Sequence, residues 1–231
     1  GGGGGEGERI NMQLSEKPTT HKSCKPKRLV FILLPTLIVV VLGLFLNHFN
    51  YWPFQGSKIA GVPDGQLVQL ENEPDLTSLL LAYGSQLKFN TTATSLTVYF
   101  DHYRKGELSA HESVASLTYE QDVSISGYLN FGIAEGQNHL LVKLFSNGAM
   151  SQTVTDLSDY DFPLTQEDRQ FGAVTTIKNG KVKLEKNKKV PLLYLAEGND
   201  GLKIYDDMAN NLAPDNLKTL PNAYLIYLKI K

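Results

Sequence analysis

One apolar segment, Leu29–Leu46, constrains this chain more than any other feature of its sequence. It runs for 18 residues without a charged side chain, and as a helix it would be about 27 Å long. That length nearly matches the roughly 30 Å hydrocarbon core of a bilayer. The segment is apolar on every face, whereas a helix that packs on a soluble core is apolar along one stripe. It therefore predicts a transmembrane helix, which we place at residues 29–50.

Basic residues predict the orientation of this helix. Five of them lie between positions 17 and 28, whereas residues 47–57 carry no charge. By the positive-inside rule, residues 12–28 are then a cytoplasmic tail and the chain beyond Tyr51 lies outside the cell. Tyr51 and Trp52 fall where aromatic side chains line the membrane interface. No small-residue cleavage site follows the segment, so the sequence favours an uncleaved signal-anchor over a cleaved signal peptide.

The first 11 residues are rich in Gly, Glu and Arg, residues whose codons a purine-rich ribosome-binding region would supply. We expect a translated leader before a true start at Met12, with an artificial glycine-rich linker as the alternative. In either case we expect residues 1–11 to contribute nothing to the fold. Cys24, the single cysteine, is expected to be a reduced thiol, with palmitoylation as the alternative for a cysteine beside a membrane.

The rest of the chain is expected to form one extracellular domain, residues 66–231, behind a Pro- and Gly-rich stalk at residues 51–65. It contains no cysteine, so its hydrophobic core must stabilise it without disulfides. Beyond Tyr51 there are 16 basic and 21 acidic residues, a net charge of −5. This balance gives no electrostatic reason to bind nucleic acid. Cysteine-free exported domains favour a Gram-positive origin.

Alternation of apolar and polar residues at a period of two predicts strands in this domain. The predicted strands are residues 96–101, 123–133, 140–145, 190–196 and 223–230, the last apolar on both faces and therefore central in a sheet. The residues 104–107 predict a turn after the first of these strands.

Two further hairpins and two helices complete the prediction. Asn147-Gly148 predicts one hairpin, and Asn179-Gly180, joining residues 173–177 to 181–185, carries the strongest hairpin signal in the chain. Short helices are expected at residues 73–82 and 204–212. The expected fold class is mainly β: an antiparallel sandwich or barrel with one or two short helices, preceded by the single N-terminal transmembrane helix.

The domain resembles a group of uncharacterised exported proteins of Firmicutes. The likeness is carried by LTVYFDHYRKGEL at residues 96–108, the serine-alternating strand after it, KKVPLLYLAEGNDG at 188–201 and the closing AYLIYLKIK at 223–231. Those proteins are anchored by a lipid or a single membrane span and have no assigned activity. The resemblance therefore implies a location and a fold class, and no chemistry.

No catalytic motif is predicted, so we expect the chain not to be an enzyme and to need no cofactor. Ser85–Lys88 matches the S-x-x-K spacing of penicillin-binding enzymes, but Ser85 enters a strand and the partner motifs are missing. There is no G-x-S-x-G elbow. His102 and His111 would approach each other across one hairpin as a zinc pair, although ordinary surface histidines explain them better, because zinc needs three or four ligands.

Two groups of charged residues are candidate binding sites. The first, Asp156, Asp159 and Asp161, offers the carboxylate oxygens that calcium prefers, although aspartates are also common in loops for turn reasons. The second group surrounds one predicted hairpin and consists of Lys178, Lys181, Lys183, Lys186, Lys188 and Lys189. These lysines would contact anionic lipids or wall polymers. The alternative is an edge strand whose lysines block aggregation.

Tyrosines offer a third candidate surface. Tyr99, Tyr103, Tyr119 and Tyr128 would form an aromatic contact face, or would fill the outside of a sheet because tyrosine favours strands.

The sequence thus predicts a single-pass membrane protein, anchored in the lipid bilayer through Leu29–Leu46, with an extracellular interaction or accessory domain that has no catalytic activity. Its expected partner is a membrane or cell-wall protein. The alternative is a module that binds cell-wall polymer, anionic lipid or calcium.

Overall fold

The structure, a computed structural model, describes residues 26–70, 81–134, 136–162, 170–175, 177, 180–198 and 218–231. Side chains are described throughout these ranges except at residues 26–32, 170–175 and 198. The chain divides into two compact units, residues 1–42 and 43–231.

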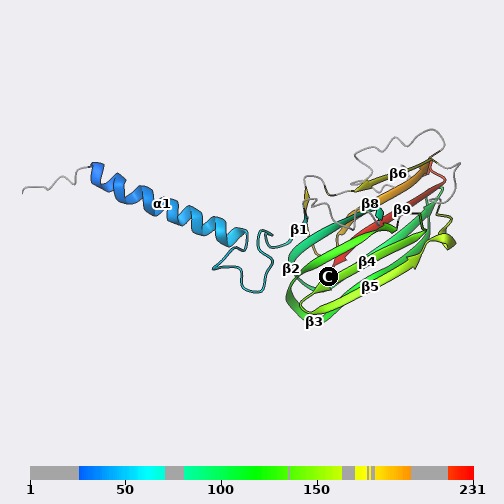
Figure 1. The fold of residues 1–231 in the computed structure, drawn as a ribbon, viewed down its shortest axis with the longest axis horizontal. Helices are drawn as coiled ribbons and strands as arrows, with labels where there is room; N and C mark the ends of the chain where they lie inside the picture. The colour runs from blue at the N-terminus through cyan, green and yellow to red at the C-terminus, as the bar shows by residue number, and fades with distance from the viewer. Residues whose placement is uncertain are drawn as a thin grey trace, which may run out of the picture. The chain divides into compact units, whose positions relative to one another are not determined.

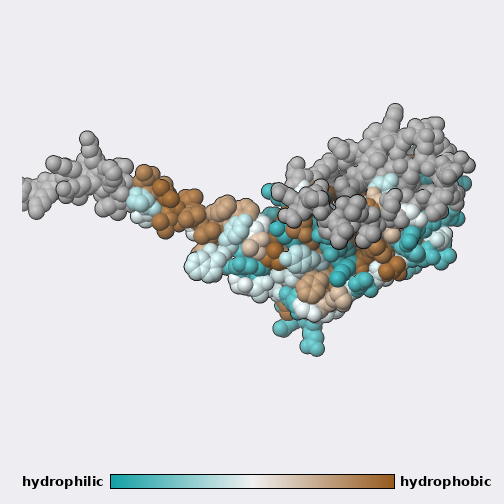
Figure 2. All heavy atoms as spheres, viewed as in Figure 1, coloured by the Kyte–Doolittle hydropathy of each residue, from teal (hydrophilic) through white to brown (hydrophobic). Residues whose placement is uncertain are grey.

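Helix α1 (Pro26–His48) contains the apolar segment, with Pro35 inside it. Its large apolar side chains from Leu33 to Phe45 are exposed, and Figure 2 shows the described part of this helix as a run of hydrophobic residues. Among the residues that the structure describes, no helix is long and apolar enough to cross a membrane.

A Schellman motif closes the C-terminal end of α1, with Asn50 as its left-handed residue. Asn50 takes a left-handed backbone conformation, with φ of 53°. The Tyr51 N–H donates to the Leu46 carbonyl at 2.8 Å, and the Asn50 N–H donates to the Asn47 carbonyl at 3.2 Å. These two bonds are the signature of the motif, and a contact between the residue after the cap and the last turn commonly accompanies them. Here Tyr51 stacks on Phe45, with ring centroids 6.4 Å apart.

The described residues of the second unit form one antiparallel sheet of nine strands (Figure 1). The strands are β1 (Gln66–Gln69), β2 (Leu81–Arg104), β3 (Glu107–Ala134), β4 (His139–Ser146), β5 (Ala149–Asp156), β6 (Gln170–Thr175), β7 (Lys181–Lys183), β8 (Lys189–Gly198) and β9 (Asn222–Ile230). They lie in the order β5-β4-β3-β2-β9-β8-β6, with β1 between β2 and β7. The prediction of a mainly β fold is confirmed.

The long hairpin of β2 and β3 organises the sheet. The first part of β2, residues 87–90, pairs with β1, and its last part, residues 96–104, pairs with β9. β3 pairs with β4 only through residues 127–133. The register of the hairpin shifts at Ala93–Ser95, between these two parts. One part of the hairpin is therefore flanked by β1 and β4, and the other part by β9. The hairpin thus contributes to two regions of the sheet.

Two-residue turns close the hairpins that join β2 to β3 and β4 to β5, as predicted. Lys105 and Gly106 have φ of 49° and 82°, and Asn147 and Gly148 have φ of 50° and 82°. Positive φ at both central residues defines a type I′ turn, whose twist matches that of the flanking strands.

Most of the core lies on one face of the strands, where period-two alternation places the apolar residues. A smaller buried cluster, Tyr194, Ala196 and Ala223, lies on the other face of β8 and β9. Leu87, Phe89, Leu129 and Phe131 belong to a single buried cluster that also includes residues of β4, β8 and β9. β9 lies between β2 and β8 and is buried along nearly its whole length, so the prediction of a central strand is confirmed.

The hairpin predicted at Asn179-Gly180 is wrong. β6 pairs with β8 through residues 170–175, whereas β7 pairs with β1. The turn signal is local and does not determine which strands pair. Six residues of β6 instead extend along β8, which leaves β7 to pair with β1. The predicted helix at residues 204–212 lies outside the described residues, as does most of the helix predicted at 73–82, whose last two residues, Leu81 and Ala82, begin β2.

Candidate functional site

The three aspartates predicted to bind calcium are placed separately by turns. Asp156 ends β5 and its Oδ1 accepts from the Ser158 N–H at 2.9 Å; hydrogen bonds from the side chain and backbone of Ser158 hold the Asp156 pKa below its usual value. Asp159 lies in a 3₁₀ turn, η1 (Ser158–Tyr160), which ends at Asp161 with φ of 59°. Asp161 faces Asn222, whose Nδ2 lies 3.5 Å from its carboxylate.

The described residues contain no group of three or more His, Cys, Asp or Glu side chains that could hold a metal ion. His102 and His111 are not brought together, because Asp101, the neighbour of His102 on β2, is the residue that pairs with His111. Adjacent residues of a strand point to opposite faces.

The predicted lysine group is divided among several carboxylates. Lys186 pairs with Asp122 at 2.6 Å, and Lys189 with Asp101 at 3.0 Å. Glu185 accepts from Lys188 and lies 3.5 Å from Lys183. These two ammonium groups, the hydrogen bond from Lys188 first, hold the pKa of Glu185 below its usual value. Lys178 lies outside the described residues. The lysines therefore do not present one free basic surface.

Lys181 and Lys183 project from β7 as exposed side chains. Among the described strands β7 pairs with β1 alone. This is the arrangement expected of lysines on a sheet edge that must not pair with another chain.

Asp101 is the buried centre of an ionic network whose cationic partners, His111 and Lys189, are partly exposed. Its carboxylate is almost fully buried; it accepts from His111 Nδ1 at 2.6 Å and from Lys189 Nζ at 3.0 Å. The Tyr103 hydroxyl donates to it at 3.3 Å. Lys189 also lies 4.3 Å from the centre of the Tyr227 ring. Burial, followed by the charge of Asp101, raises the pKa of both tyrosines, which stay neutral phenols at neutral pH.

The His111–Asp101 pair resembles half of a catalytic triad, because a carboxylate orients one ring nitrogen and leaves the other for chemistry. The ring of His111 stacks on Tyr99, with centroids 5.1 Å apart. Within the described residues, His111 Nε2 makes no hydrogen bond to a hydroxyl group. The ion pairs of Asp101 with His111 and Lys189 connect β2, β3 and β8.

A second polar network lies around Asn222, at the start of β9. Asn222 Nδ2 donates to Glu197 at 2.7 Å, so its oxygen must accept from His102 Nε2 at 3.0 Å. His102 is buried and stacks on Tyr224, with centroids 4.8 Å apart. Its pKa lies below the usual value, chiefly because burial penalises the charged ring. This network satisfies polar groups at the edge of the core.

The clearest surface feature is a row of side chains that crosses six neighbouring strands. Register pairs connect its members one after another: Lys181, Val68, Lys88, Tyr128, Phe145 and Met150. The inward neighbours on β3 and β4, Leu129 and Leu144, are buried, so the row lies on the outer face of the sheet. We call it the cross-strand row.

The row is basic at one end and apolar at the other. Phe145 is 41% exposed and Met150 57%, and Tyr128 beside them is also exposed. Val154, 58% exposed, lies on the same face of β5, four residues from Met150. Clustered exposed apolar side chains are typical of protein interaction sites, and Tyr, Phe and Met are enriched there.

Sequence reasoning found one apolar residue of this surface, Tyr128. The other three tyrosines singled out behave differently: Tyr99 and Tyr103 border the Asp101 network, and the hydroxyl of Tyr119 is buried. Phe145 was predicted in a strand but was not assigned to the outer face. The signal was present, since Phe145 alternates in phase with the exposed Lys143.

Comparison of the chain with protein-family models, with curated proteins and with solved structures found no match. The resemblance to exported proteins of Firmicutes therefore stays a prediction.

Proposed function

We propose that this chain is a single-pass membrane protein whose β domain lies outside the cell and binds a protein partner through the cross-strand row. The observation that carries the proposal is the row itself: three exposed apolar side chains, Tyr128, Phe145 and Met150, are neighbours on adjacent strands. The basic end, Lys88 and Lys181, favours a partner whose apolar surface is bordered by carboxylates.

The anchor is supported by α1. The apolar run Leu29–Leu46 lies within this 23-residue helix, and its large apolar side chains from Leu33 to Phe45 are exposed. Water disfavours a helix that is apolar on all sides, and a bilayer favours it. The basic residues before it favour a cytoplasmic N-terminus.

The finer architecture that we propose for the domain is a sandwich. The Ser116 N–H, in the first part of β3, lies 3.3 Å from the Ser151 hydroxyl of β5. β5 pairs with β4, and β4 with the last part of β3. This hydrogen bond brings β5 beside the other part of β3. A sheet that curls back on itself in this way encloses its core between its two regions, which supports a sandwich.

Binding rather than catalysis is supported by the polar networks. Asp101 and Asn222 each use their hydrogen-bonding capacity on neighbouring side chains. Catalytic groups, in contrast, converge on a position where a substrate atom can lie.

Site-specific photocrosslinking tests the proposal. A photoreactive phenylalanine analogue placed at Phe145 in cells should give one discrete crosslinked product, whose protein partner mass spectrometry identifies. The matched control carries the analogue at Leu108, which is 54% exposed near the β2–β3 turn and outside the row. The proposal fails if position 145 gives no product, or if both positions give the same products.

A further inference from the structure

The chain between α1 and β1 folds back on the end of the helix. These 17 residues, 49–65, would span about 55–60 Å if extended. Instead the Gly61 N–H donates to the Phe49 carbonyl at 2.8 Å, so the chain returns to the helix end after 12 residues. β1 begins five residues later, at Gln66. This compact loop, with its ends close together, gives the domain little reach from the helix.

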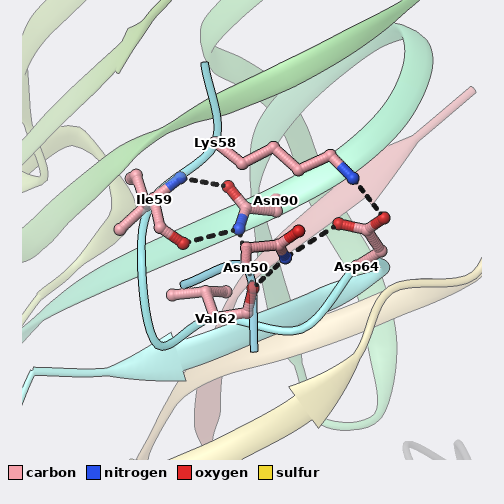
Figure 3. Close-up of polar contacts among 6 residues, drawn as sticks. All are labelled: Asn50, Lys58, Ile59, Val62, Asp64 and Asn90. Carbon is pink, nitrogen blue, oxygen red and sulfur yellow. Dashed lines mark hydrogen bonds and ion pairs between the residues drawn. The ribbon is translucent and has the colours of Figure 1, made fainter. Parts of the chain in front are cut away.

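Two buried asparagines fix the loop in place (Figure 3). The Val62 carbonyl accepts from Asn50 Nδ2 and from Asn90 Nδ2, each at 2.7 Å. Asn90 also bonds both backbone groups of Ile59 at 2.9 Å. Asn50 belongs to the helix cap and Asn90 to β2. One carbonyl oxygen therefore connects the last turn of α1, the loop and the sheet.

The fixed loop exposes aromatic side chains beside the end of the helix. Trp52 is 82% exposed and Phe54 48%, with Tyr51 also exposed. Tyr51 stacks on Phe45 of the helix, so the apolar helix surface continues onto the loop. The two charged side chains of the loop, Lys58 and Asp64, pair with each other at 2.5 Å. Aromatic side chains in this setting, at the end of an apolar helix, prefer the membrane interface.

We propose that Tyr51, Trp52 and Phe54 insert into the headgroup interface of the bilayer that holds α1 and seat the domain directly on the membrane. This inference rests on the proposed function. It adds that the predicted stalk is a membrane contact, and it specifies the partner class. Lys88 of the cross-strand row lies on the same face of β2 as Asn90, two residues away. The row therefore borders the loop, and its partner is a protein in the membrane or at its surface.

Trp52 is the only tryptophan of the chain, so intrinsic fluorescence reports on this loop alone. The full chain is reconstituted in phosphatidylcholine–phosphatidylglycerol vesicles that contain brominated lipids, with bromine either near the headgroup or deep in the acyl chain. We expect blue-shifted emission and stronger quenching by the shallow bromines. Flotation of the same vesicles measures anchoring separately.

The matched control moves the tryptophan. The double variant Trp52→Phe, Leu108→Trp places it at an exposed position outside the loop, where we expect water-like emission without bromine quenching. If the protein floats but Trp52 has water-like emission, the inference is overturned and the anchor stands. Equal quenching at positions 52 and 108 overturns the inference as well. If the protein does not float, the proposed anchor is overturned, and the inference with it.

Discussion

At the scale of single residues, Asn90 shows how one buried amide can order a loop. Its side chain bonds Ile59 N–H, Ile59 C=O and Val62 C=O. Backbone groups buried without a partner cost about 1–3 kcal/mol each, and the loop offers no helix or sheet to satisfy them. The amide of Asn90 supplies one acceptor and two donors, the complement that these three groups require.

We predict that Asn90→Ala lowers the free energy of unfolding by about 2–4 kcal/mol, because hydrogen bonds to buried groups are lost. Urea unfolding of the full chain in mild detergent measures this change. Chymotrypsin should also cleave the variant faster at the aromatic residues of the loop. Asn130→Ala, at a half-exposed position of β3, is the control and should change stability by less than about 0.5 kcal/mol. Equal effects would contradict the role of Asn90.

His102 makes stability depend on pH. Its pKa is lowered in the folded protein, chiefly by burial, while in the unfolded chain it is about 6.5. Below that pH the unfolded chain binds more protons than the folded one, so protonation favours unfolding. The contribution of His102 to the free energy of unfolding is therefore fully present above about pH 6.5 and is lost as the pH falls.

The prediction is that His102→Gln makes the free energy of unfolding fall less steeply than in the wild type between about pH 7 and 5. Gln keeps an amide that can donate to Asn222. Urea titrations at several pH values measure the two slopes, and at about pH 8 neither chain has a charge at this position. Parallel curves would rule out His102 as the titrating group.

At the scale of elements, the two type I′ turns have the same backbone conformation but different surroundings. Gly106 and Gly148 both have φ of 82°. A Cβ on Gly106 would lie 2.7 Å from Lys218 Cα and 2.9 Å from Lys218 N, whereas a Cβ on Gly148 would meet nothing within 4 Å. Left-handed backbone costs a non-glycine residue about 1–2 kcal/mol in either turn.

We therefore expect Gly148→Ala to lower the free energy of unfolding by about 1 kcal/mol and Gly106→Ala to lower it clearly more. The difference between them isolates the steric contact with the backbone of Lys218, since the conformational strain is common to both. Urea unfolding of the two variants gives the difference directly. If the two variants are equally stable, the chain at Lys218 does not pack against the β2–β3 turn.

The elements also show which parts of the fold a sequence can predict. The alternation of apolar and polar residues correctly predicted strands around Leu96, Ile125 and Leu140. The residue types at Lys105-Gly106 correctly predicted a turn. Both signals are local in the sequence. Pairing is not local. The Asn179-Gly180 signal failed because β6 and β7 pair with β8 and β1. The cross-strand row depends on the registers of five strand pairs at once, so no single segment contains it.

At the scale of the whole molecule, the proposed function requires the two ends of α1 to lie on opposite sides of a membrane. The chain provides its own test, because Cys24 is the single cysteine and precedes the apolar segment. If the N-terminus is cytoplasmic, a membrane-impermeant maleimide should leave Cys24 unlabelled in intact cells and label it after the cells are permeabilised.

The complementary variant is Cys24→Ser, Met150→Cys, which moves the only thiol to an exposed position of the cross-strand row. This thiol should be labelled in intact cells, because the row would face the exterior. A bound partner that covers the row would slow this labelling, and permeabilisation would not restore the rate. The opposite result would be labelling of Cys24 in intact cells and protection of the thiol at position 150 in the variant until the cells are permeabilised. It would show that the orientation is the reverse of the one proposed, with the row and its partner in the cytoplasm. The two thiols thus test the location of the binding surface even before its partner is identified.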